Sequence, residues 1–223
     1  PSDATASELI NRYPFTKRKI RIVHYGIESR FFKKVDDGSK TIIDSPYFLS
    51  IGNIKPHKNL DRLIEAFICF QQSRTDIRLV IVGRDFMSQE LRQKVNSRGL
   101  SKYIEFFGEV DEGKLLELYY GAMALIHPSL MVGFGFTPLE AMAIGTPVLC
   151  SKAGSLPEVC GESVIYFNPL DIYDIVSAMI KISSDSRLRS AMSGNGVKHA
   201  LKFTWDKCIS GFTGICHEAL NEK

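Results

Sequence analysis

The segment with the clearest capacity for chemistry is the stretch SLMVGFGFTPLEAMAIGT, residues 129–146. Gly133 and Gly135 relax the backbone between an apolar run that ends at His127 and an apolar helix that begins near Pro138. In such an arrangement, free N–H groups and the positive end of the helix dipole face any phosphate above the loop. The stretch therefore favours an anion-binding site.

The same residues also support a plainer interpretation, in which they form only a helix start. Thr137 at the N-cap, Pro138 in the first helical position and Glu140 in the third make a capping box, and Glu140 would then close the first turn. Short glycine motifs are common in turns, so spacing alone leaves both interpretations open.

The residues that usually hold metals do not occur in a suitable pattern. The chain has no Asp-x-Asp motif and no group of carboxylates and histidines at the spacing of metal ligands. The five cysteines include no Cys-x-x-Cys pair, which argues against a disulfide framework and a zinc site and fits a reducing cytoplasm. We expect no metal and no cofactor.

The composition is that of an ordinary soluble globular protein, with 44% hydrophobic and 24% charged residues among 223. The net charge of +3 comes without a long run of one sign, so we expect no nucleic-acid partner. No stretch reaches the roughly 20 apolar residues that cross a bilayer, and no signal peptide is evident. Because the chain begins at Pro1, we expect a processed product or a piece of a longer protein.

The elements that must position the loop are short apolar strands that alternate with helices. Strands are predicted at residues 20–25, 47–52, 78–83, 103–108, 122–127, 146–151 and 163–168. Helices are predicted at residues 2–13, 59–68, 89–98 and 186–201, and after Asp111, Thr137, Asp171 and Thr204. Residues 33–45 and the segment that contains Gly154 and Pro157 are predicted as loops.

Three of these helices have a distinct apolar side. The members of these sides are Leu60, Leu63, Ile64, Phe67 and Ile68 after a cap at Asn59; Ile172, Ile175, Val176, Met179 and Ile180; and Trp205, Cys208, Ile209, Phe212, Ile215 and Cys216. The first two sides are predicted to face the interior.

The alternation of strands and helices predicts an α/β fold, a Rossmann-like doubly wound parallel sheet with helices on both faces. In such sheets the ligand lies beyond the carboxyl ends of the strands, where the loops after Gly52, Gly83, Gly108 and His127 would gather. These loops carry glycines and charges. The fold therefore strengthens the prediction of a phosphate-bearing ligand.

Several short blocks occur in an order typical of one family. The blocks are SDATASELINRY, VHYGIESRFF, SIGNIKPHKNLDRLIEAF, LVIVG, FFGEV, LLELYYGAMALIHPSL, VGFGFTPLEAMAIGTPVLCS and FTWDK. In these blocks the chain resembles the C-terminal, donor-binding half of the retaining nucleotide-sugar glycosyltransferases that have a GT-B fold. This group is the glycosyl transferases group 1 family, and the resemblance is especially to its mannosyltransferases. The resemblance implies a tail of the preceding domain at residues 1–19, the donor-binding domain at 20–200, and a final helix at 201–223 that packs back toward the missing domain.

The resemblance also implies roles for residues at the first turn. Lys58 would bind the donor diphosphate, in the turn that includes Gly52 and Asn53. Position 53 is commonly arginine in the family, and Asn53 reaches less far, so either phosphate binding would be weaker or Lys55 or Arg84 would substitute. Taken alone, Lys58 and Arg84 also fit ordinary surface positions.

Further roles follow for the other loops. Backbone groups of Glu109 and Val110 would contact the base, although a plain turn is an equal alternative. Main-chain N–H groups of Gly133, Phe134, Gly135, Phe136 and Thr137 would bind the phosphates and the sugar, and Glu140 would accept the ribose hydroxyls. Lys58 and Glu140 would support the donor and the transition state, and no catalytic residue is assigned.

One position departs from the family pattern. The family usually has a glutamate at position 132, where it hydrogen-bonds the sugar, and this chain has Val132. A valine neither accepts a hydrogen bond nor carries charge, so the hexose is recognised differently or activity is reduced or absent. His127 can line the pocket, although a lone histidine at the end of an apolar strand is more often a hydrogen-bonded structural residue.

The resemblance thus implies transfer of a mannose-like or glucose-like hexose from a nucleoside diphosphate sugar, GDP-mannose-like or a UDP-sugar, to a glycan or lipid-linked acceptor with retention. The isolated chain is expected to bind but not to transfer, in the cytoplasm or at the inner face of the membrane, with peripheral membrane contact in the longer protein. An alternative is a non-catalytic nucleotide-binding or scaffold module, degenerate at Asn53 and Val132. A dinucleotide-binding domain is disfavoured because no Gly-x-Gly-x-x-Gly follows the first strand.

Overall fold

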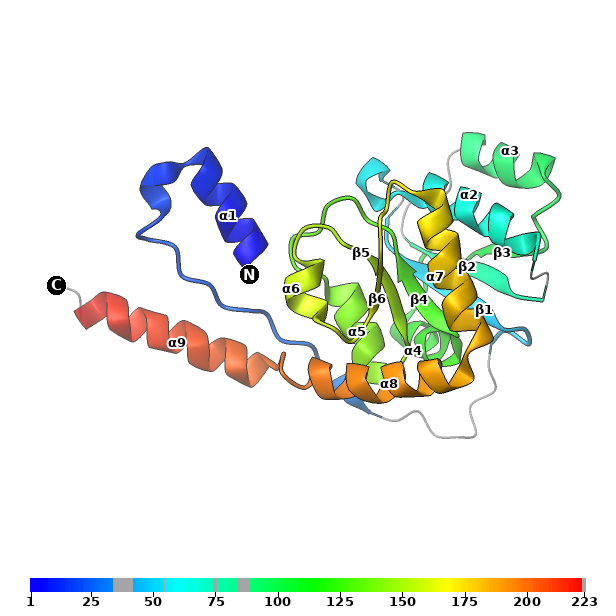
Figure 1. Ribbon diagram of the computed structural model, residues 1–223. Coiled ribbons are helices and arrows are strands. Elements are labelled where there is room, and N and C mark those ends of the chain that lie inside the picture. The colour runs from blue at the N-terminus through cyan, green and yellow to red at the C-terminus, as the bar shows by residue number, and fades with distance from the viewer. Residues whose placement is uncertain (34–41, 54, 74–75, 84–88, 222–223) are drawn as a thin grey trace.

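The centre of the protein is a six-stranded parallel sheet. The computed structural model describes residues 1–33, 42–53, 55–73, 76–83 and 89–221. The strand order is β3-β2-β1-β4-β5-β6 (Figure 1). The strands are β1 (Tyr47–Ile51), β2 (Arg78–Val82), β3 (Ile104–Phe106), β4 (Ala124–His127), β5 (Val148–Ser151) and β6 (Ile165–Phe167). This order confirms the doubly wound parallel sheet, because the chain moves outward from β1 in one direction and then returns to build in the other.

Both faces of the sheet are buried, which explains why its strands are almost continuously apolar. In β1, Phe48 belongs to one buried cluster and the next residue, Leu49, belongs to the other. In β2, Leu79 and Val80 divide in the same way. Alternate side chains therefore build two cores, one on each side of the sheet.

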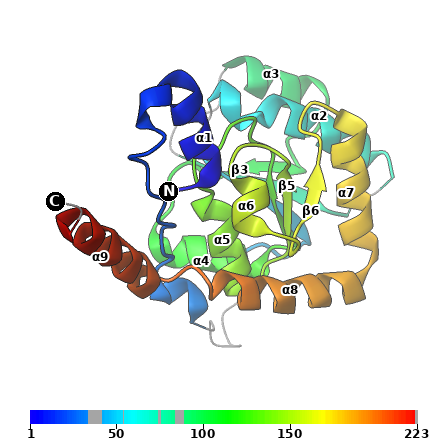
Figure 2. The ribbon, with the colours of Figure 1, turned by 60° about the vertical axis from the view of Figure 1, so that its left-hand side comes forward.

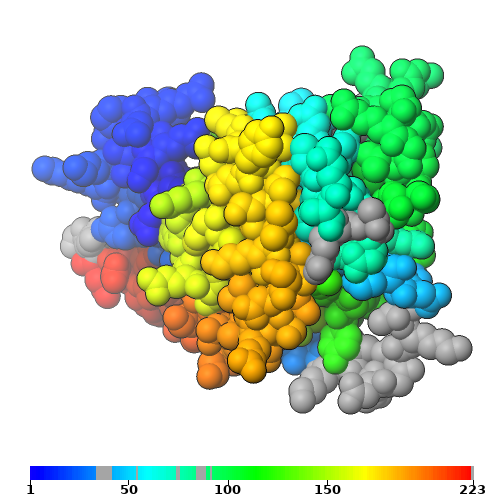
Figure 3. Space-filling model, turned by 45° about the vertical axis from the view of Figure 1, so that its right-hand side comes forward, coloured from blue at the N-terminus to red at the C-terminus, as the bar shows by residue number. Residues whose placement is uncertain are grey.

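Helices cover each core. One face is covered by α2 (Leu60–Gln71), α3 (Gln89–Ser97) and α7 (Ile172–Ser184), and the other by α4 (Glu112–Gly121), α5 (Phe136–Ile144) and the short α6 (Leu156–Cys160). Figure 3 shows α7 and α2 side by side across the first face, where they contact each other. The helix α8 (Ser186–Ala200) packs against α5.

Two helices extend to one side of this body. Figures 1 and 2 place α1 (Asp3–Arg12) and α9 (Trp205–Asn221) together on that side, next to the chain ends. The remaining helical turns are the short η1 (Pro14–Thr16), η2 (Ser29–Phe32) and η3 (Pro56–Lys58). Within the described residues, no helix is long and apolar enough to span a membrane.

The strand predicted at residues 20–25 is wrong. This segment is not a strand of the sheet, and the nearby bridge in the described chain is the one between Ile27 and Thr204. It runs between α1 and the body, away from the sheet edge (Figure 1). An alternating pattern becomes a strand only where a neighbouring strand can accept its hydrogen bonds.

Three further predictions differ in detail. The loop with Gly154 and Pro157 contains α6, since proline is well suited to the first helical turn. On α7, Ile175 and Met179 are buried as predicted, but Ile180 is 43% exposed. The helix α9 contains no buried residue, so its predicted apolar side is exposed. Residues 34–41 of the predicted loop at 33–45 lie outside the described residues.

Candidate functional site

A cavity of about 430 Å³ opens at the carboxyl ends of β1 and β4. Its lining comes from the turn after β1 and the loop after β4, with two residues of the N-terminal segment: Pro1, Tyr25, His57, Lys58, His127, Met131, Val132, Gly133, Phe134, Gly135, Phe136 and Thr137. Because β1 and β4 are the neighbouring strands from which the chain winds in opposite directions, the cavity lies at the switch point where ligands bind in this kind of sheet.

Hydrogen bonds join the two loops that form the cavity. Leu130 N donates to the His57 carbonyl at 2.7 Å. Asn59 Nδ2 donates to the carbonyls of Pro128 at 3.1 Å and Pro169 at 2.7 Å. Asn59 occupies the N-cap position of α2, but its side chain does not cap the helix as predicted. Its left-handed backbone, with φ of 57°, turns the amide toward the neighbouring strand ends instead.

The glycines after β1, β2 and β3 let three loops meet closely. Gly83 N donates to the Gly108 carbonyl at 3.0 Å. A Cβ atom at Gly83 would lie 2.0 Å from the Gly52 carbonyl oxygen, so no other residue fits without moving the backbone. These loops gather as predicted. Arg84 lies outside the described residues.

Lys58 supplies the positive charge of the cavity. The aliphatic part of its side chain passes over Gly52, with Cε 3.5 Å from the place where a Cβ of residue 52 would stand. Within the described chain the Lys58 ammonium has no carboxylate or hydrogen-bond partner. Partial burial, and secondly the charge of Lys55, lowers the pKa of Lys58. An anion in the cavity would offset both effects.

His127 is buried but not hydrogen-bonded through Nε2, contrary to the prediction of a satisfied structural histidine. It is 3% exposed, and its Nε2 has no partner in the described part of the chain. Burial, and secondly the charge of Lys58, lowers the pKa of His127 to about 3. The imidazole is therefore neutral at physiological pH.

The helix α5 begins at Phe136, two residues before the predicted first helical position at Pro138. Gly135 is the N-cap, with φ of 108°, a conformation that glycine adopts far more readily than other residues. The predicted capping box is wrong, because Thr137 and Pro138 lie inside the helix and no side chain caps its N-terminus. The backbone N–H groups of the first turn lack partners within the helix and lie at the cavity wall.

The carbonyl groups of the glycine loop are bonded to the protein. Ser155 Oγ donates to the Phe134 carbonyl at 2.7 Å, and Ser155 N donates to the Val132 carbonyl at 3.2 Å. The hydroxyl groups of Ser2 and Thr5 donate to the Gly133 carbonyl at 2.9 and 3.1 Å. Exposed carbonyl oxygens would repel a phosphate, but these oxygens already accept hydrogen bonds from the protein. The loop can therefore offer its N–H groups to an anion.

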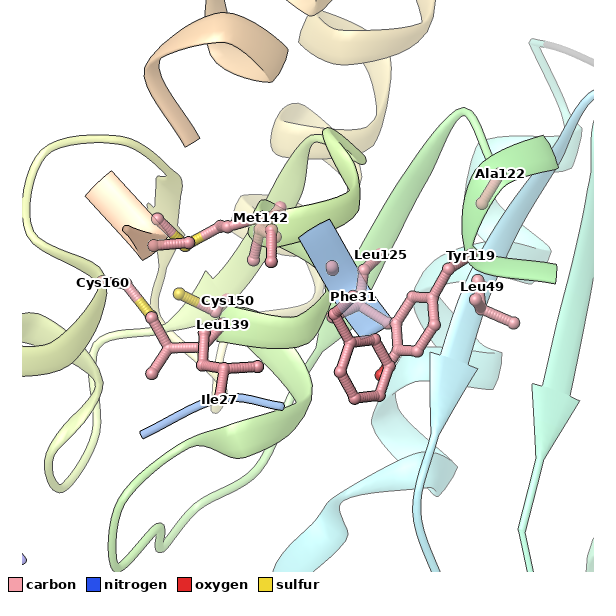
Figure 4. Close-up of a cluster of buried hydrophobic side chains, with 14 of the residues drawn as sticks. Ile27, Phe31, Leu49, Tyr119, Ala122, Leu125, Leu139, Met142, Cys150 and Cys160 are labelled. Atoms are coloured by element: carbon pink, nitrogen blue, oxygen red, sulfur yellow. The ribbon is translucent and has the colours of Figure 1, made fainter. Parts of the chain in front are cut away.

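Glu140 lies on α5 behind this loop. Tyr119 is completely buried, and its hydroxyl group donates to Glu140 Oε2 at 2.8 Å. Figure 4 shows Tyr119 beside Phe31, whose ring it meets edge to face at 6.2 Å between centroids. Burial raises the pKa of Glu140, while the hydrogen bond from Tyr119 and the charge of Arg30 lower it. The carboxylate is thus held in one orientation with further lone pairs free to accept.

Not all predicted site residues meet in this cavity. Lys58 and the loop from Gly133 to Thr137 line it, and so does Val132 at the position of the absent glutamate. Within the described residues, its lining does not include Gly52, Asn53, Glu109, Val110 and Glu140. Glu109 is exposed and Val110 packs beside the core, both after β3.

Asp3, His24 and Glu158 form a cluster that sequence spacing did not reveal. Their potential ligand atoms lie within 4.8 Å of one another. However, the Glu158 carboxylate already accepts from Asp3 N at 2.8 Å and from Ala4 N at 3.3 Å, and it contacts His24 Nε2 at 2.6 Å. It acts as an anchor for the N-terminus of α1, and we assign no metal to it.

Comparisons with known proteins agree with this architecture. The family model "Glycosyl transferases group 1" matches residues 33–199. The chain is 27% identical over 217 residues to O-antigen chain mannosyltransferase B of Escherichia coli, covering 94% of the chain and 57% of that protein. It is 29% identical over 234 residues to D-inositol 3-phosphate glycosyltransferase of Acidothermus cellulolyticus, covering 98% and 52%. The chain thus spans about half the length of these relatives.

Solved structures have the same fold. The crystal structure of the C-terminal domain of a glycosyl transferase group 1 family protein, LpcC, from Francisella tularensis is 28% identical, with a TM-score of 0.70 over 79% of this chain and 97% of that one. Sucrose-phosphate synthase from Thermosynechococcus elongatus has a TM-score of 0.82 at 22% identity, over 100% of this chain and 58% of that one. The chain therefore belongs to the glycosyl transferases group 1 family and has the fold of the C-terminal domain of a GT-B glycosyltransferase.

Proposed function

We propose that the chain is the donor-binding domain of a retaining hexosyltransferase that uses a nucleoside diphosphate sugar. The observation that carries this proposal is the cavity at the switch point, where Lys58, unpaired within the described chain, meets a glycine loop and the N-terminus of α5. These groups suit a diphosphate. The name of the E. coli relative, a mannosyltransferase, supports a mannose-like sugar over a glucose-like one.

Each site residue has a place in this proposal. Lys58 and the N–H groups at Gly133–Thr137 bind the diphosphate, and their positive charge stabilises the leaving nucleoside diphosphate. Glu140, oriented by Tyr119, accepts the ribose hydroxyl groups. Gly52 and Asn53 shape the turn that carries Lys58, and the backbone at Glu109 and Val110 contacts the base. These groups neutralise the negative charge of the donor diphosphate. We therefore expect the domain to bind its donor without a metal ion or a cofactor.

The rest of the reaction belongs to a longer protein. The acceptor, a glycan or a lipid-linked glycan, binds to a preceding domain, of which residues 1–19 are the tail. The exposed apolar side of α9 packs back toward that domain. The full-length protein works in the cytoplasm, with peripheral contact to the inner face of the membrane.

Calorimetry with UDP, GDP, ADP and their sugars tests the proposal. We expect one preferred nucleotide, and the substitution Lys58→Ala should weaken its binding by about 10-fold to 100-fold, as for the loss of a charged hydrogen bond. An exposed lysine on the far side of α7, Lys181, provides the matched control Lys181→Ala, which should bind normally. If the protein binds none of these nucleotides, the proposal is wrong.

Val132 favours a second candidate function. It lines the cavity at the position where the family usually has a carboxylate, so the domain would bind a nucleotide without transferring sugar. The full-length protein should be assayed with each donor that the chain binds. Absence of transfer, together with transfer after Val132→Glu, would establish this non-catalytic function and exclude the enzyme.

A further inference from the structure

The end of β4 holds polar side chains that the protein itself leaves unpaired. Of the four buried side-chain atoms without a hydrogen-bond partner in the described chain, two are His127 Nε2 and Ser129 Oγ. These residues are two positions apart, and they are 3% and 1% exposed. Buried polar groups are nearly always paired. The described part of the fold therefore leaves the imidazole of His127 unsatisfied, and of these two residues His127 also belongs to the lining of the cavity.

The backbone around His127 is fixed. His127 is the last residue of β4 and is paired with Cys150 of β5. The carbonyl group of the next residue, Pro128, accepts a hydrogen bond from Asn59 Nδ2 at 3.1 Å. Two residues further on, Leu130 N donates to the His57 carbonyl. The imidazole is thus held at the cavity wall by bonds on both sides.

The chemistry of the cavity indicates what the missing partner is. His127 and Lys58 line the same cavity, and the lining within the described residues includes no aspartate or glutamate. A neutral imidazole offers one N–H donor, and an ammonium group offers three. A donor next to a cation, with no carboxylate in the lining, suits an oxygen of a phosphate group.

We infer that the imidazole of His127, which lines the cavity beside Lys58, donates a hydrogen bond to an oxygen of the donor diphosphate. The inference rests on the proposed function, since it requires that the cavity bind a diphosphate. It adds a binding side chain from β4 to those of the two loops. His127 also supplies a polar contact in a part of the cavity where Val132 supplies none.

Binding and stability of His127 variants test this inference, with inorganic pyrophosphate and GDP as the probes. The substitution His127→Leu removes an unpaired polar group from an apolar site, so it should raise the midpoint of thermal unfolding. The same substitution should weaken binding of both probes by about tenfold or more. A histidine with a purely structural role would produce a lower midpoint and unchanged binding.

Amide variants refine the test. The side-chain amide of glutamine or asparagine keeps an N–H donor at position 127, near one or the other of the two ring nitrogens. We expect at least one of His127→Gln and His127→Asn to recover part of the affinity that His127→Leu loses. The exposed His217 of α9 provides the control His217→Leu, which should change neither binding nor the unfolding midpoint.

NMR of protein with ¹⁵N-labelled histidine provides an independent readout. The Nε2 resonance of His127 should shift when pyrophosphate is added, and that of His217 should not. Binding that depends on Lys58 but is unchanged in His127→Leu, with a silent His127 resonance, would overturn this inference and leave the proposed function standing. If the unaltered protein binds neither pyrophosphate nor GDP, both are overturned.

Discussion

At the scale of single residues, the proposed site includes two ionisable groups whose pKa values are shifted in opposite directions. Lys58 is a half-buried cation next to another lysine, and Glu140 is a half-buried carboxylate next to a tyrosine. Burial disfavours the charged form of each, so it lowers the pKa of the lysine and raises that of the glutamate. In the proposed function, both groups bind the nucleotide in their charged forms.

Lys58 should make nucleotide binding sensitive to high pH. Because its pKa is lowered, by burial first and then by Lys55, the ammonium form is lost at a lower pH than for an ordinary lysine. At pH values where Glu140 is ionised, affinity should be constant up to this lowered pKa and should fall as the pH rises through it. Calorimetry across alkaline pH measures this loss, and Lys55→Ala should move it to higher pH. An unchanged midpoint in Lys55→Ala would contradict the argument.

Glu140 should produce the opposite dependence at acid pH, and Tyr119 should control it. Affinity requires the carboxylate, so it should be lost as the pH falls through the pKa of Glu140. The hydrogen bond from Tyr119 lowers that pKa. In Tyr119→Phe the loss should therefore begin at a higher pH, with a stability decrease of about 1 kcal/mol. The exposed neighbour Tyr120 provides the control Tyr120→Phe, and equal pH profiles in the two variants would refute a positioning role for Tyr119.

At the scale of elements, the start of α5 decides the shape of the binding loop. Gly135 has φ of 108°, and a Cβ at this position would lie 3.0 Å from Leu156 Cδ2. We expect Gly135→Ala to lower the free energy of unfolding by about 1–3 kcal/mol through backbone strain. At Gly133 a Cβ would meet no atom within 4 Å, so Gly133→Ala should change stability by less than about 0.5 kcal/mol. Chemical denaturation compares the two, and equal effects would contradict this explanation.

The attachment of α1 to Glu158 of α6 is a second property of this scale. Partial burial would raise the pKa of Glu158, but the hydrogen bonds from His24, Asp3 N and Ala4 N outweigh it and lower the pKa. The stabilisation is therefore complete above the ordinary value of 4.5 and is lost as the pH falls through the lower folded-state pKa.

Hydrogen exchange of the α1 amides measures this attachment. At neutral pH, Glu158→Gln should reduce the protection of α1 and leave that of α7 unchanged. The exposed Glu162 nearby provides the control Glu162→Gln. Equal protection of α1 in the two variants would show that the carboxylate does not anchor the helix.

At the scale of the whole molecule, the described chain is one half of a two-domain architecture. The sheet and its two cores are complete, whereas α1 and α9 lie to one side and α9 buries no residue. We expect the isolated chain to bind the donor without transferring sugar. The longer protein should transfer it, and NMR of the product should show the anomeric configuration of the donor. An inverted product would contradict the proposed mechanism.

The sequence by itself determined the class of fold and the elements of the sheet. Runs such as those of β1 and β2, apolar except for Ser50 and Arg78, can be satisfied only when both faces of a strand are covered. The alternation with helices then allows little besides a parallel doubly wound sheet. The glycine loop and Lys58 were also predictable, because their position at strand ends follows from the order of the elements. These properties depend on local periodicity.

The tertiary structure decided which local patterns were realised. Residues 20–25 alternate like a strand but do not join the sheet, and the capping box of Thr137 was displaced because Gly135 could begin the helix earlier. His127 seemed a structural histidine, and only the packing around it showed a buried Nε2 without a partner. Pairing, burial and hydrogen-bond satisfaction depend on residues distant in sequence, so no local pattern contains them.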